Sequence, residues 1–166
     1  MVDYAEKLSS CHDFSSIFNL VKTAVKENLG MRRVGLLLGL SDLPGPIGAY
    51  HAVGSNFIVL NRIPLQEVMK SSGDVKLVNA YVFETLLHEY LHTLGYIDEG
   101  QVRHLTRTIC RSTFGEKHPT TIIATRGPIS IFPGLRQVQR INPGVEAASR
   151  IEIVADFEKD NISYFA

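Results

Sequence analysis

Apolar positions recur every three or four residues in several stretches, which is the spacing of an amphipathic helix. Polar residues fill the positions between them, and each stretch adjoins a residue typical of a helix end. The four predicted helices are residues 13–29 before Gly30, 65–70 after Pro64, 75–94 between Asp74 and Gly95, and 99–114 before Gly115.

Other stretches have the pattern of strands. Residues 33–40 form a continuous apolar run, which suits a strand buried on both faces, and residues 49–61 read as two short strands around a turn at 53–56. Residues 118–135 are too rich in proline and glycine for a long regular element. They suit either a surface segment that forms one wall of a specificity pocket or a segment that serves packing alone. Residues 151–157 fit a strand or a helical turn. The predicted fold is α+β, a small zincin-like domain over residues 1–166 with a short mixed sheet against the 75–94 helix and further helices.

Composition narrows the choice of partners. The chain has 17 Lys and Arg and 17 Asp and Glu, so no bulk charge attracts nucleic acid or a membrane, and neither is expected as a partner. Its N-terminus has no secretory pattern, so we expect a cytoplasmic protein. Cys11 and Cys110 form no C-x-x-C pair and are expected to be free thiols, with capping of a metal by Cys11 as an alternative. The oligomeric state stays open.

The chemistry centres on His88, Glu89 and His92, which form an H-E-x-x-H motif. On a helix, residues i and i+4 lie on one face, so both imidazoles can bind one metal ion. Glu89 can then take a proton from a water at an open coordination position. The two histidines fall on a different stripe of the helix from its repeated leucines, which argues against two core histidines.

A catalytic zinc usually has three protein ligands, so a third is needed. Asp98 follows His92 by six residues, across a glycine that lets the chain turn back, and its carboxylate suits zinc. Asp98 could instead cap the next helix. The other candidates for the third ligand are Glu99, His104, Glu116 and His118.

Residues 88–98 resemble the H-E-x-x-H-x-x-G-x-x-(H/D) motif of metzincin metallopeptidases, in the form with a third aspartate seen in snapalysin-like enzymes. The hairpin and motif helix also resemble the upper half of zincin domains, including small archaeal gluzincin-like proteins. The resemblance implies that His88, His92 and Asp98 bind Zn²⁺ and that Glu89 is the general base. The chain departs from the metzincin pattern because its methionines, at positions 1, 31 and 69, all precede the motif, so no methionine turn follows it.

The leading hypothesis is therefore a zinc metallopeptidase acting on a peptide or protein substrate. We expect an extended substrate to add itself as a strand to the edge of the 49–61 hairpin. Candidate donors to the oxyanion are Tyr96, Tyr50, His51 and Arg126. The alternatives are a metal-dependent endoribonuclease, whose histidine spacing the motif also resembles, another hydrolase, or a latent or non-catalytic metal-binding protein.

Overall fold

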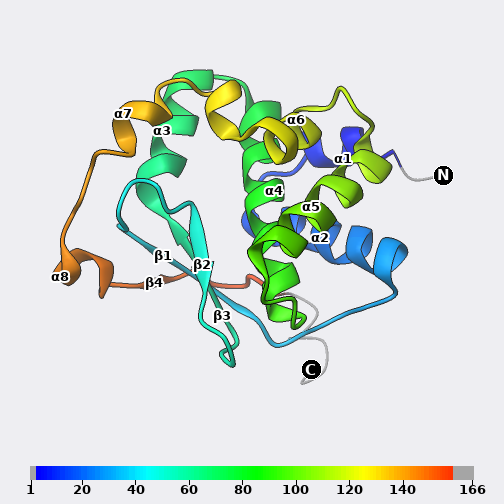
Figure 1. The fold of residues 1–166 in the computed structure, drawn as a ribbon, viewed down its shortest axis with the longest axis horizontal. Coiled ribbons are helices and arrows are strands. Elements are labelled where there is room, and N and C mark those ends of the chain that lie inside the picture. Colours follow the sequence, from blue (N-terminus) through cyan, green and yellow to red (C-terminus); the bar gives the residue numbers. More distant parts are fainter. Residues whose placement is uncertain (1–2, 159–166) are drawn as a thin grey trace.

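Helix α4 (Val75–Thr93) runs through the centre of the structure, between a small sheet and a group of helices (Figure 1). The computed structural model describes residues 3–158. The other elements in chain order are α1 (Tyr4–Ser9), α2 (Phe14–Leu29), β1 (Leu37–Ser41), β2 (Ala49–His51), β3 (Phe57–Asn61), α3 (Arg62–Ser72), α5 (Glu99–Phe114), α6 (Pro119–Arg126), the 3-10 turn η1 (Pro128–Ser130), α7 (Leu135–Val138), α8 (Val145–Ala148) and β4 (Glu152–Ile153).

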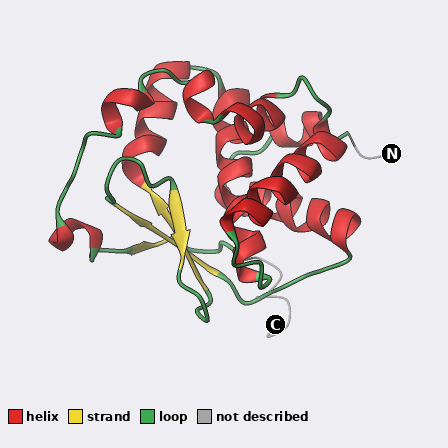
Figure 2. Cartoon of the chain, in the orientation of Figure 1, coloured by secondary structure: helices red, strands yellow, loops and turns green. Residues whose placement is uncertain are grey.

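The sheet has four strands in the order β2-β3-β1-β4. Strands β1 and β3 are parallel, with Leu37 opposite Phe57, while β2 and β4 pair antiparallel with β3 and β1. Figure 2 shows the strands gathered on one side and most helices on the other. Strand β2 is therefore an edge, and it contacts α4, as expected for the hairpin. The α+β prediction with a short mixed sheet is confirmed.

Local signals explain where α4 begins and how it is held. The Asp74 carboxylate accepts a hydrogen bond from the Lys76 N–H at 2.9 Å, so the helix begins with the N-cap that its sequence predicts. Phe83, Leu87 and Leu91 are fully buried in the core. Burying three such side chains stabilises the fold by about 1.5–3 kcal/mol each, so α4 is a rigid platform for the histidines it carries.

Two predicted boundaries were wrong, and one short helix was not predicted. Strand β1 begins at Leu37, because Arg33 leaves the strand path and donates to the Thr93 carbonyl at 2.7 Å and the Ser55 carbonyl at 3.1 Å. Helix α3 begins at Arg62 and not after Pro64, because the Asn61 side chain caps it by accepting from the Ile63 N–H. The stretch expected to be irregular contains the eight-residue helix α6.

The last two described residues, Phe157 and Glu158, pack into the core. Phe157 stacks on Phe18 with ring centroids 4.3 Å apart. The Glu158 carboxylate lies 3.8 Å from the Lys22 ammonium, and both side chains are buried. Glu158 also accepts from the Leu36 N–H at 3.2 Å, so it holds this part of the chain against the residues that precede β1. The expectation of a loose end otherwise concerns residues 159–166, which lie outside the described residues.

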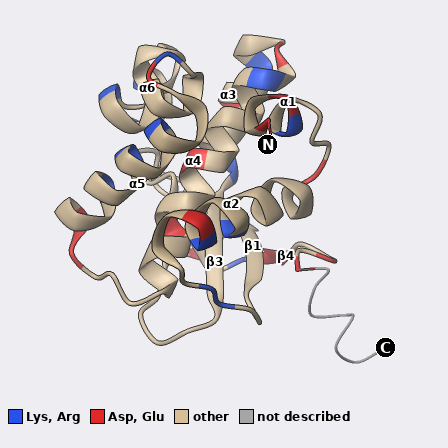
Figure 3. Ribbon diagram, turned by 90° about the vertical axis from the view of Figure 1, so that its right-hand side faces the viewer, with Lys and Arg blue, Asp and Glu red and all other residues tan. Residues whose placement is uncertain are grey.

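Both signs of charge are spread over the surface, with blue Lys and Arg turns recurring along α5 (Figure 3). Within residues 3–158, no helix combines the length and apolar character needed to cross a bilayer. The cytoplasmic location stays a prediction. Cys11 and Cys110 are free and buried, as expected.

Candidate metal centre

His88, His92 and Glu99 meet at the junction of α4 and α5. The Glu99 carboxylate lies between the rings, with Oε2 at 3.1 Å from His88 Nε2 and Oε1 at 2.7 Å from His92 Nε2. One ligand atom from each residue lies within 4.8 Å of the other two, and this is the one such group of three or more potential metal ligands in the part of the chain that the structure describes. The i, i+4 spacing of the histidines therefore puts both on one face, as predicted.

The turn between the helices orients His92. Its Nδ1 lies 2.8 Å from the Tyr96 carbonyl oxygen, which can only accept, so Nδ1 carries the proton and Nε2 is left facing Glu99. Carbonyl partners of this kind fix the tautomer of metal-binding histidines. Gly95, with a φ of +105°, provides the turn that brings Tyr96 back under the ring.

The contacts to Glu99 fit a cation between the three side chains. Because Nδ1 of His92 already donates, a hydrogen bond from its Nε2 to Glu99 requires a charged imidazolium. A divalent cation can replace that proton and satisfy both rings and the carboxylate. Two imidazoles and one carboxylate are a donor set that zinc uses in catalytic sites. The residues present therefore fit zinc.

The pKa shifts of His88 and Glu99 agree with this fit. Burial lowers the pKa of His88, against the opposing charge of Glu99, and so favours the neutral imidazole that binds metal. Desolvation tends to raise the pKa of Glu99, but the charges and hydrogen bonds of His88 and His92 outweigh it and lower that pKa. Glu99 is therefore ionised at neutral pH.

The structure brings Glu99, not Asp98, to the histidines. The Asp98 carboxylate caps α5, accepting from the Gln101 N–H at 2.8 Å, and Asp98 is outside the three-residue group. This is the capping role that the sequence left open. Asp98 is the N-cap of α5, and Glu99, its first residue, presents a carboxylate to His88 and His92.

The remaining candidates for the third ligand lie elsewhere. His104 is exposed on α5, and Glu116 pairs with Arg111 at 2.5 Å. His118 caps α6, where its Nδ1 accepts from the Thr120 N–H at 3.2 Å. Cys11 contacts the Lys7 carbonyl and is not in the group of potential ligands, so nothing in the described chain supports it as a metal cap.

Glu89 lies beside this group and is only 7% exposed. Among the described residues, none donates a hydrogen bond to its carboxylate, and Glu89 lines the pocket. Burial raises the pKa of Glu89 to about 7, with His92 lowering it and Glu99 raising it. A carboxylate poised near neutral pH and open to a pocket is suited to accept and return a proton.

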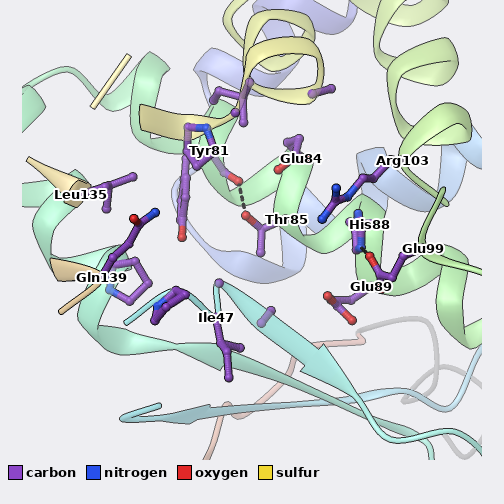
Figure 4. Close-up of a pocket in the computed structure, with 18 of the residues that line it drawn as sticks. Ile47, Tyr81, Glu84, Thr85, His88, Glu89, Glu99, Arg103, Leu135 and Gln139 are labelled. Carbon is purple, nitrogen blue, oxygen red and sulfur yellow. Dashed lines mark hydrogen bonds and ion pairs between the residues drawn. The ribbon is translucent and has the colours of Figure 1, made fainter. Parts of the chain in front are cut away.

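A pocket of about 700 Å³ opens from His88, Glu89 and Glu99 (Figure 4). Strand β2 and the loop before it form one wall, and α6 and η1 form another, so the 118–135 segment lines the pocket, which is one of the two roles that its sequence suits. Tyr81, Glu84 and Thr85 of α4 extend the pocket lining away from His88 and Glu99.

Two arginines in the lining were missed from the sequence. Arg103 and Arg107 reach the pocket from α5, one and two turns after Glu99. Arg103 and Arg107 follow Glu99 at four-residue intervals, so all three lie on one face of α5. If Glu99 is a metal ligand, this spacing predicts that both arginines lie on the same side of the helix as the metal. The four side chains expected to donate to an oxyanion, Tyr96, Tyr50, His51 and Arg126, are not among the lining residues.

Comparisons with protein-family models, with curated proteins and with solved structures gave no match to this chain.

Proposed function

We propose that this protein is a zinc-dependent metallopeptidase. One observation carries the proposal: a His88–His92–Glu99 donor set adjoins the buried, unpartnered carboxylate of Glu89 at the mouth of a pocket. The resemblance of residues 88–98 to the metzincin motif supports it. Glu99 replaces Asp98 as the proposed third ligand, which makes the site His-His-Glu.

The reaction divides between the metal and the chain. Zinc held by these three side chains would supply Lewis acidity toward the scissile carbonyl and acidify a water molecule. Glu89 accepts the proton of the attacking water and passes it to the leaving amine. Its pKa of about 7 suits both transfers, because an acid and base of intermediate strength gives and takes a proton with similar ease.

The chain also offers a place for an extended substrate. The Asn61 N–H donates to the Gly48 carbonyl at 2.9 Å, so this pair points into the sheet. Backbone groups alternate in direction along an antiparallel pair, so those of Ala49 and His51 point to the free edge. Gly48 and Ala49 line the pocket, which places free backbone donors and acceptors where a peptide strand could pair.

Metal removal and replacement tests the proposal. Protein treated with a chelator should lose hydrolysis of a peptide library and regain it with one equivalent of zinc. An RNA library treated in the same way should stay intact. Hydrolysis that survives metal removal, or zinc-dependent cleavage of RNA and not of peptides, would overturn the proposal.

A further inference from the structure

Two charged stripes, one on α4 and one on α5, lie next to each other beside the pocket. On α4, Glu84, His88 and His92 follow one another at four-residue intervals, and on α5 the corresponding stripe is Glu99, Arg103 and Arg107. The chain reverses between the helices, so His92 and Glu99 meet at the turn and later members of the α5 stripe approach earlier members of the α4 stripe. The potential metal ligands lie near the turn between the helices, and Arg103 and then Arg107 follow along α5 away from it.

Arg103 lies between Glu84 and His88 and points into the pocket (Figure 4). Within residues 3–158, neither Arg103 nor Arg107 forms an ion pair or a side-chain hydrogen bond. Arg111, one turn further along α5, instead pairs with Glu116 and does not line the pocket. The two pocket arginines thus present ten unused N–H donors, five on each guanidinium.

Resting on the proposed function, we infer that Arg103 and Arg107 form a subsite for a carboxylate of the substrate, supplied by a free C-terminus or by an acidic side chain. Guanidinium groups bind carboxylates through two parallel hydrogen bonds. One helical turn advances about 5.4 Å and one extended residue about 3.3–3.6 Å. Arg103 is one turn from Glu99, so the carboxylate belongs within about two residues of the scissile bond.

The other charges of the pocket favour this small anion over a nucleic acid. Glu84, Glu89 and Glu99 also line it, and they repel the several charges of a phosphate chain more strongly than the single charge of one carboxylate. Glu84 is half-buried, and burial followed by the charge of Glu89 raises its pKa to about 7, against the lowering effect of Arg103. A partly protonated Glu84 leaves Arg103 free for an incoming carboxylate and can itself donate a hydrogen bond to it.

The test compares two pairs of acetylated oligoalanine peptides, and the two members of each pair differ by one negative charge. One has a free C-terminal carboxylate, one a C-terminal amide, and two are amides with a single internal glutamate or glutamine. Binding is measured by calorimetry on zinc-loaded Glu89→Gln protein, so that the reading does not depend on turnover. The carboxylate peptides should bind about ten- to a hundredfold more tightly than their neutral partners. A preference for the free C-terminus or for the glutamate identifies the source.

Matched variants assign the effect to the pocket. Arg103→Met and Arg107→Met, each in the Glu89→Gln background, should remove most of the preference, and Arg111→Met should keep it. Arg103→Lys, which keeps charge, should retain part of it and guards against a folding defect. Equal binding of the four peptides, no binding of any, a preference unchanged by Arg103→Met, or tighter binding of a single-stranded RNA would overturn the inference. Peptide hydrolysis with no charge preference would leave the proposed function standing, and preference without hydrolysis would leave the subsite standing.

Discussion

The assignment of the third ligand makes a sharp prediction, because two adjacent carboxylates compete for the role. Glu99→Gln removes the charge that lies between the two histidine rings. Asp98→Asn removes the neighbouring charge but keeps a side-chain oxygen that can accept from the Gln101 N–H, and asparagine caps helices about as well as aspartate. The pair therefore separates loss of a ligand from loss of a cap.

The magnitude follows from the contacts. Partners of metal ligands are typically worth 10–100-fold in affinity, so loss of a ligand itself should weaken zinc binding by about a hundredfold or more. With zinc at a hundred times the wild-type Kd, binding stabilises wild type by about 2.7 kcal/mol and Glu99→Gln by about 0.4 kcal/mol. For a chain of this length that difference corresponds to about 5–9 °C in Tm.

Thermal unfolding with and without zinc, together with a competition titration against a chromophoric chelator, measures both effects. Wild type and Asp98→Asn should show the same zinc-induced rise in Tm, and Glu99→Gln should lose most of it. Since the Glu99 side chain is 59% exposed, all three metal-free proteins should unfold within about 2 °C of one another. A zinc response lost in Asp98→Asn and kept in Glu99→Gln would refute the assignment.

Three further predictions concern stability, each measured by urea unfolding of metal-free protein. Arg33→Met removes the donors that tie the end of α4 to the hairpin turn and should lower the free energy of unfolding by about 2 kcal/mol; an unchanged value would count against that tie. Glu158→Ala removes a buried carboxylate that pairs with Lys22 and accepts from the Gly35 and Leu36 N–H groups, and it should cost about 3–5 kcal/mol. Glu152→Ala, at an exposed pair, should cost under about 1 kcal/mol; similar losses would contradict this. Glu84 has a raised pKa, so its contribution to folding stability is fully present below about pH 4.5 and is lost as the pH rises through about 7. The free energy of unfolding of wild type should fall by about 1–3 kcal/mol over this range, and that of Glu84→Gln should fall by less.

Much of the helical framework could be predicted because its signals are local. Helix α5 runs from Glu99 to Phe114, the predicted range, since Asp98 caps its start and a glycine follows its end. The H-E-x-x-H motif likewise put His88 and His92 on one helical face, whatever surrounds them. Periodicity and capping act over a few residues, and so they can be read directly from sequence.

The third potential ligand and the pocket lining could not be predicted, because they depend on tertiary packing. The same Asp98 signal fits a cap and a ligand, and only the path of the turn through Gly95 shows that the next residue, Glu99, faces the histidines. Helix α6 was missed because Pro119 looks like a breaker, although proline is well suited to the first turn of a helix. The role of Arg103 in the pocket depends on how α5 packs against α4, which no local pattern determines.

The most direct test of the central claim is peptide-library cleavage, read by mass spectrometry, with zinc-loaded wild type and zinc-loaded Glu89→Gln in parallel. Both proteins should contain one zinc per chain, because Glu89 is not among the proposed ligands. Wild type should release fragments with new amino termini, and the variant should be slower by at least about a hundredfold, since general base catalysis contributes about 10²–10⁴-fold. Equal cleavage by two proteins with equal zinc content would contradict Glu89 as the base, and no cleavage by zinc-loaded wild type of any peptide in the library would contradict the metallopeptidase itself.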